Sequence, residues 1–377
     1  MEMFGWIATL VLGYGIPFLF VLTIVVFFHE LGHFLVARWC GVGVETFSVG
    51  FGRELFGWTD RHGTRWRVSL IPLGGYVKFA GDSGEASTPD RSVIEAMTEE
   101  ERARAFHTKP LWARASVVAA GPLANFLLAI VIFTTVFAIN GKQVSAPLVD
   151  KVVENSAAER AGLQSGDLVL SIDGKRIESF LDLQRIVSTS AGLPLILEIR
   201  RDGEIVPVEI TPERQEIVDR FGNKQSIGVL GVHRSISQDD IIVQTFTVPQ
   251  AVVAGTQETF FIVERTITFL SGIITGRESP RNLGGPVRIA QVSGQVATLG
   301  FMALINLAAL LSVSIGLINL FPIPMLDGGH LMYYAYEAVR GRPLSERMQD
   351  IGFRVGLALV LMLMVFATWN DILHIVS

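Results

Sequence analysis

Phe27-Phe28-His29-Glu30-Leu31-Gly32-His33 is the stretch that decides the fold and the chemistry of this chain. It continues an uncharged apolar run, Met3–Phe28, that is long enough to cross a membrane. A glutamate flanked by two histidines is costly at membrane depth, so such a cluster there indicates a functional site. Positions i and i+4 of a helix share one face. His29 and His33 can therefore hold one zinc ion, with Glu30 beside them as general base.

The composition indicates a membrane protein. Its 377 residues are 50% hydrophobic and its mean hydropathy is +0.44, which is too apolar for an ordinary soluble enzyme. A span needs about 20 apolar residues. Four segments meet this requirement: Met3–Phe28, Ala115–Ile139, Phe301–Met325 and Ile351–Trp369. We therefore expect a polytopic α-helical membrane protein with four transmembrane helices.

The positive charges predict the orientation of these spans. Lys and Arg are concentrated between Arg38 and Arg114 and again between Arg340 and Arg347, whereas both termini carry almost none. The positive-inside rule then places both basic loops in the cytoplasm and both termini outside, in the periplasm of a bacterial inner membrane. No Lys or Arg precedes Arg38, which argues against a cleaved signal peptide. The net charge of −5 indicates no nucleic-acid partner, and the single Cys40 excludes an internal disulfide.

A β-prone, Gly-rich region, 41–80, follows the first span and completes the N-terminal membrane core, 1–143, together with the second span. Its alternating runs are separated by turn residues, which predicts β-hairpins packed at the membrane face near the zinc motif. Non-helical backbone at membrane depth is tolerated where protein or a cavity satisfies its hydrogen bonds. Residues 81–108 read as a polar cytoplasmic connector.

Residues 144–213 predict one compact α/β domain on the periplasmic side. Expected strands at 147–153, 168–172, 195–199 and 205–210 alternate with short helices at 156–162 and 180–188. This order resembles a PDZ domain of the bacterial periplasmic-protease type. The resemblance rests on Ala161-Gly162-Leu163, Gly166-Asp167 and Ile172-Asp173-Gly174. A PDZ groove binds a peptide terminus as an added strand. The alternative is a small α/β domain that only packs.

Residues 214–300 form a periplasmic linker that contains an amphipathic segment, 248–275. Aromatic and aliphatic side chains alternate there with Glu258, Glu264 and Arg265. This pattern suits a helix lying at the outer membrane interface. A helix packed against the PDZ-like domain explains it nearly as well.

A second polar cluster lies in the C-terminal membrane core, 301–377. It is Asn319-Leu320-Phe321-Pro322-Ile323-Pro324-Met325-Leu326-Asp327-Gly328-Gly329-His330. Two histidines leave a tetrahedral zinc in need of a third protein ligand, and Asp327 is expected at the same depth as His33. The two prolines break the helix and free backbone groups for a substrate. We read His330 as a polar helix-start residue rather than a fourth ligand.

Together these motifs resemble the site-2 proteases, which are intramembrane zinc metalloproteases. The likeness is to the bacterial sigma-E regulatory type with a periplasmic PDZ insertion, although some members carry two PDZ domains and this sequence shows one. It covers the His29-to-His33 motif, Gly121-Pro122-Leu123-Ala124-Asn125, the inserted domain and Asn319-x-x-Pro322 through Gly328.

The resemblance implies that His29, His33 and Asp327 bind Zn²⁺ and that Glu30 activates water. It further implies that Asn319 holds the substrate backbone or stabilises an oxyanion and that Asn125 contacts substrate or orients the site. The substrate-binding residues expected from it are Asn125, Asn319, Pro322, Gly74 and Gly75. The two asparagines have an alternative, a hydrogen bond across helices, which is common in membranes.

The function expected from the resemblance is regulated intramembrane proteolysis. The substrates would be single-span proteins in the lipid bilayer, such as anti-sigma factors or signal-peptide remnants, with peptide termini binding at the PDZ-like domain. A catalytically silent membrane adaptor is one alternative, which the intact Glu30 and ligands disfavour. A metal transporter is another; it would require polar residues along several spans, whereas here they gather at one depth in two.

Overall fold

The computed structural model describes residues 9–82, 97–218, 224–234, 242–277, 279–280 and 283–376. The beginning of the first expected span, Met3–Ala8, and most of the connector, 83–96, lie outside these residues, as do parts of the expected linker. The chain divides into two compact units. The membrane unit comprises Met1–Thr134, Val252–Val263 and Leu283–Ser377, and the inserted unit comprises Thr135–Ala251 and Glu264–Asn282.

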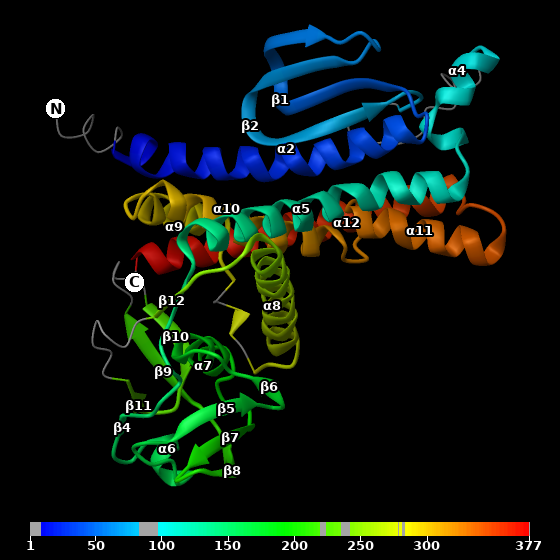
Figure 1. The fold of residues 1–377 in the computed structure, drawn as a ribbon. Coiled ribbons are helices and arrows are strands. Elements are labelled where there is room, and N and C mark those ends of the chain that lie inside the picture. The colour runs from blue at the N-terminus through cyan, green and yellow to red at the C-terminus, as the bar shows by residue number, and fades with distance from the viewer. Residues whose placement is uncertain are drawn as a thin grey trace. The chain divides into compact units, whose positions relative to one another are not determined.

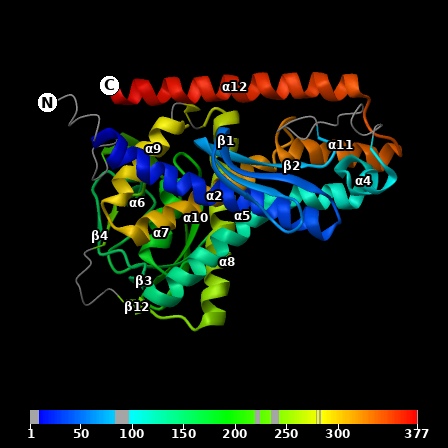
Figure 2. The ribbon, with the colours of Figure 1, turned by 90° about the horizontal axis from the view of Figure 1, so that it is seen from above.

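Four helices of the described chain are long and apolar enough to cross a membrane, which confirms the prediction of four spans. They are α2 (Ile16–Trp39, preceded by the π-helical turn η1, Thr9–Gly15), α5 (Leu111–Asn140), α10 (Phe301–Asn319) and α12 (Glu346–Val376). Figure 2 shows α12 as one continuous helix. The third span ends at Asn319 rather than at Met325, since Pro322 lacks the N–H that another helical turn would need.

The β-prone region forms a hairpin of two long, bent strands, β1 (Val44–Thr59) and β2 (Arg65–Phe79), which lie along α2 (Figure 1). Because both strands bend, residues 46–49 of β1 pair on one side with 75–78 and on the other with 65–68. Gly50 and Gly52 take positive φ at the bend. Within the described residues, segment 75–79 has a strand partner on one side only. The N–H of Phe79 donates to the Asp82 carboxylate at 3.1 Å, which leaves residues 75–78 as the edge that lacks a second strand.

The spanning helices approach one another closely at glycines. A Cβ added to Gly32 of α2 would lie 2.3 Å from the backbone oxygen of Ala120 on α5. Such contacts require small residues, as is usual between membrane helices. Helix α9 (Pro286–Ala297) packs against η1 in the same way, because a Cβ on Gly294 would lie 2.3 Å from the Tyr14 ring.

Asp371, near the end of α12, caps α9. Its carboxylate accepts hydrogen bonds from the backbone N–H groups of Gly285 (2.8 Å) and Arg288 (3.0 Å). The amphipathic segment is the helix α8 (Val248–Ile274). In the membrane unit it packs against α5, since a Cβ on Gly255 would lie 2.8 Å from the backbone nitrogen of Thr134.

The inserted unit is built on an antiparallel sheet of order β6-β5-β7-β8. Its strands are β5 (Leu168–Ile172), β6 (Lys175–Arg176), β7 (Leu195–Arg201) and β8 (Glu204–Ile210), with helices α6 (Ala157–Arg160) and α7 (Phe180–Ser188). The expected strand 147–153 is reduced to β4 (Lys151–Val152), which pairs with β11 (Val232–His233). Four further strands of the described residues belong to this unit: β3 (Lys142–Val144) pairs with β12 (Ile242–Gln244), and β9 (Glu213–Val218) with β10 (Lys224–Val229).

Ser156 and Ser179 begin the two helices of the inserted unit, each accepting a hydrogen bond from the N–H three residues later. Leu197 and Ile199 lie in its core, fully buried. The remaining helices belong to the membrane unit and are α4 (Glu99–Arg104), the short 3₁₀ turn η2 (Phe106–Thr108) and α11 (Asp327–Arg340).

Candidate active site and metal centre

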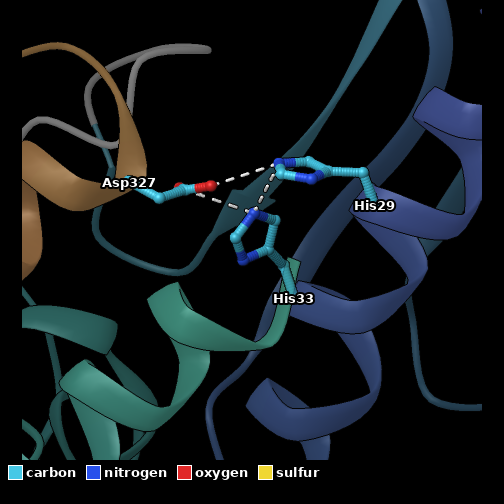
Figure 3. Close-up of side chains that lie close together, drawn as sticks. All are labelled: His29, His33 and Asp327. Carbon is cyan, nitrogen blue, oxygen red and sulfur yellow. Dashed lines mark hydrogen bonds and ion pairs between the residues drawn. The ribbon is translucent and has the colours of Figure 1, made fainter. Parts of the chain in front are cut away.

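His29 and His33 lie one turn apart on α2, and their imidazole rings are directed toward each other and toward Asp327 (Figure 3). Both are buried, with 9% of each residue exposed, and their Nε2 atoms are 3.2 Å apart. The i, i+4 spacing therefore places both imidazoles on one face of the helix, as the sequence predicts.

Asp327 is brought to the two histidines by a tight turn between α10 and α11. Its Oδ2 atom lies 3.2 Å from Nε2 of His29, and its Oδ1 atom lies 3.6 Å from Nε2 of His33. Gly328 and Gly329 allow α11 to begin directly against this turn, since a Cβ on either would lie within 2.4 Å of a backbone oxygen. Met325 adopts φ of 97°, a strained conformation for a side chain other than glycine.

These three side chains fit a tetrahedral zinc ion. Zinc–ligand bonds of about 2.0 Å at tetrahedral angles separate neighbouring ligand atoms by about 3.3 Å. The two Nε2 atoms are 3.2 Å apart, and each lies near a different oxygen of Asp327, at 3.2 Å from Oδ2 and 3.6 Å from Oδ1. With one ligand atom from each residue, the three atoms all lie within 4.8 Å of one another, so small side-chain shifts would bring them to tetrahedral separations. Two imidazoles and one carboxylate are also a usual catalytic donor set, which leaves a fourth position for water or substrate. Zinc would thus be held by His29, His33 and Asp327.

Helix α5 fixes the second histidine from behind. Nδ1 of His33 lies 2.8 Å from the backbone oxygen of Val117, which can only accept a hydrogen bond. The proton of His33 therefore sits on Nδ1, and Nε2 presents its lone pair to the centre. Gly121 leaves the room for both rings, because a Cβ there would lie 2.3 Å from His33 Nε2 and 2.9 Å from His29 Cε1.

Asn125 of α5 stands behind the first histidine. Its side chain is fully buried, and its amide nitrogen lies 3.2 Å from Nδ1 of His29. The Asn125 backbone oxygen accepts a hydrogen bond from Oγ of Ser312 on α10, at 2.9 Å. Asn125 thus faces a metal ligand and is absent from the lining of the cavity next to the site.

That cavity has a volume of about 630 Å³. Glu30, Gly74, Gly75 and Asn319 line it together with the metal-binding side chains, so the structure brings these predicted site residues together. Pro322 lies in the turn after α10, is exposed and is not part of the lining. A Cβ added to Gly75 would lie 3.1 Å from Cγ of Glu30, so the edge of β2 passes directly beside the candidate base.

Two further lining residues are His330, which the sequence predicts as a helix-start residue, and Tyr334, for which it predicts no role; both lie on α11. Burial lowers the pKa of His330 and keeps its imidazole neutral, while burial raises the pKa of the Tyr334 phenol. His330 lies in the first turn of α11. Arg114 of α5 stacks on the Tyr334 ring at 5.0 Å and bonds Glu337 at 2.5 Å, which ties α11 to α5.

Comparison with known proteins gives matches over nearly the whole chain. The sequence pattern described as peptidase family M50 matches residues 17–363. A protein of Rhizobium meliloti (strain 1021) named as a zinc metalloprotease is 53% identical, covering 96% of this chain and 97% of its own length. A protein of Agrobacterium fabrum that is also named as a zinc metalloprotease is 49% identical, and the match covers 97% of each chain. Metalloprotease MmpA of Caulobacter vibrioides is 40% identical, with 95% of this chain and 94% of its own covered.

Among solved structures, part of this chain is similar to the PDZ domain of an SdrC-like protein from Listeria monocytogenes. The match covers 22% of this chain and 82% of that domain, with 19% sequence identity and a TM-score of 0.18. The corresponding domain from Listeria innocua matches 25% of this chain and 97% of its own, with 20% identity and a TM-score of 0.20.

Proposed function

Because the chain belongs to peptidase family M50 and is a zinc metalloprotease, we propose that it hydrolyses peptide bonds of single-span membrane proteins inside the bilayer. The observation that carries this proposal is the position of two ligands, His29 and His33, within a membrane-spanning helix. A substrate must then reach the site through the membrane or at its edge. Anti-sigma factors and signal-peptide remnants are the substrate classes proposed from the family resemblance.

In the proposed mechanism Glu30 is the general base. Zinc supplies Lewis-acid activation of the attacking water and of the scissile carbonyl. Glu30 lines the same cavity, takes a proton from the water and returns it to the leaving amide nitrogen. Asn319, at the end of α10, lines the cavity, and its amide would hold the substrate backbone or the developing oxyanion.

We further propose that the substrate binds as an extended strand. A helical peptide bond is shielded by its own turn, so the substrate must unwind before it is cut. The edge of β2 at residues 75–78 has no second strand partner among the described residues and lies beside Glu30, where Gly74 and Gly75 line the cavity. Main-chain pairing there would align the scissile bond with little dependence on side-chain sequence.

For the inserted unit we propose a role as a size filter or docking site on the outer side of a bacterial inner membrane. This orientation rests on the positive-inside rule, with both termini outside and the site towards the cytoplasm. Deletion of residues 144–213 is expected to relax any requirement for a shortened substrate. Unchanged selectivity between full-length and trimmed substrates would contradict this role.

The decisive experiment compares wild type with Glu30→Gln in detergent, using a model single-span substrate. We expect the variant to keep about one zinc per chain, since Glu30 is not a ligand, and to lose cleavage by about 10²–10⁴-fold. A Glu30→Gln protein that cleaves at the wild-type rate would exclude Glu30 as the base. A wild-type protein that binds zinc and cleaves soluble peptides but no transmembrane substrate would exclude the intramembrane assignment.

A further inference from the structure

Asn125 is the only described side chain recorded within hydrogen-bond distance of Nδ1 of His29. His29 must offer an unprotonated Nε2 to bind a metal ion, so its single proton must be on Nδ1. His33 meets this requirement through the Val117 carbonyl. For His29 the partner that decides the tautomer is an amide, which has a donor at one end and an acceptor at the other.

In the structure, the Asn125 amide is oriented for the other tautomer of His29, the one with its proton on Nε2. Its nitrogen donates to Nδ1 of His29, which puts the proton on Nε2 and suits the ion pair of that atom with Asp327 Oδ2 at 3.2 Å. Oδ1 of Asn125 is meanwhile buried and has no hydrogen-bond partner among the described residues. A half-turn of the amide about χ2 changes its shape very little and brings Oδ1 to Nδ1.

We infer that Asn125 is a positioning residue, whose Oδ1 accepts the Nδ1–H of His29 and thereby fixes Nε2 as a zinc ligand. The inference rests on the metal site of the proposed function and replaces substrate contact as the role of this asparagine. Because an amide can present either end, Asn125 can serve His29 both in the ion pair with Asp327 and in metal binding. Leucine can serve neither, and a carboxylate can serve only the metal-binding tautomer.

Three variants test this role through metal affinity, measured in full-length protein by competition between the site and a zinc chelator. Asn125→Leu is expected to weaken zinc binding by about 10–100-fold, the usual effect of losing an outer-shell partner. Asn125→Asp keeps an acceptor at the same place and is expected to bind zinc at least as tightly as wild type. Ser312→Ala is the matched control: it removes the other recorded hydrogen bond of Asn125 and keeps the amide, so its zinc affinity should stay unchanged.

The absorption bands of the Co²⁺-substituted protein supply a second readout, because they respond to the geometry of the ligands. We expect them to change in Asn125→Leu and to stay as in wild type in Ser312→Ala. The inference is overturned if Asn125→Leu binds zinc as wild type does, or if Asn125→Asp loses as much affinity as Asn125→Leu. Since both readouts report the metal alone, they remain decisive if no cleavage of a membrane substrate is found.

Discussion

Gly121 on α5 is the position at which one methyl group should abolish the metal site. In Gly121→Ala the new Cβ would lie 2.3 Å from Nε2 of His33, which is 1.1 Å short of the 3.4 Å at which ordinary contact begins. It would also lie 2.5 Å from His33 Cε1 and 2.9 Å from His29 Cε1. Both rings would have to move, and metal sites tolerate changes of only about 0.2 Å in ligand distance.

The helices cannot readily separate to make room instead. Gly32 and Ala120 already hold α2 and α5 in close contact one turn away, and Nδ1 of His33 is anchored on the Val117 carbonyl. Separation would break these contacts, at a cost of about 1–3 kcal/mol in the free energy of unfolding. We therefore expect zinc affinity to fall by more than the roughly 10–100-fold typical of outer-shell changes.

The assay is zinc affinity by chelator competition, together with the thermal unfolding midpoint of the protein in detergent. Gly13→Ala is the matched control, because apart from its neighbours in its own helical turn no atom of the described residues lies within 4 Å of its added Cβ, and it should bind zinc as wild type does. Gly121→Ala with wild-type zinc affinity and a wild-type midpoint would refute the argument that this glycine makes room for the imidazoles.

Two further predictions concern stability. In the inserted unit, burial alone would raise the pKa of Asp167, but hydrogen bonds from Arg201 and from the N–H of Gln164 outweigh it and hold that pKa below its usual value. This contribution to stability is present above the usual pKa of an aspartate and is lost as the pH falls through the lowered value. Asp167→Asn should therefore destabilise the full-length protein by about 1–3 kcal/mol at pH 7, and this difference should shrink in acid. Glu209→Gln, at an exposed position, is the control and should not destabilise it. Equal urea unfolding midpoints of Asp167→Asn and wild type at pH 7 would contradict the prediction. Asp371→Ala removes the carboxylate that caps α9 and should cost about 1–2 kcal/mol, read as a lower thermal midpoint with zinc affinity retained; an unchanged midpoint would show that the cap contributes nothing.

The sequence predicts the chemistry of the centre better than its surroundings. His29 and His33 follow from helical spacing alone, and Asp327 from the need for a third ligand at the same depth. The partners of the two histidines could not be predicted in this way. One is a backbone carbonyl, of Val117, and every residue carries the same one. The other is Asn125, whose residue type fits substrate contact, a bond across helices and orientation of the site equally well.

The positions of helix ends and strand bends could likewise not be predicted from local sequence patterns. The third apolar run continues to Met325, yet α10 ends at Asn319, because Pro322 lacks the N–H of another helical turn and the chain turns before α11 begins at Asp327. The paired prolines of that turn predict a break without its position. Alternation in residues 41–80 predicts strands, whereas the pairing of residues 46–49 on both sides depends on the bend at Gly50 and Gly52.

Three glycines on three elements make the space in which the motif can work. Gly32 lets α2 and α5 touch, Gly121 admits the two imidazoles between them, and Gly75 lets the edge of β2 pass beside Glu30. A histidine–glutamate motif on an apolar helix could otherwise satisfy its polar groups by pairing with one another, which would bury the base and close the open ligand position. The arrangement of backbone around the motif, rather than the motif alone, is what leaves both a metal position and a substrate edge within reach of one carboxylate.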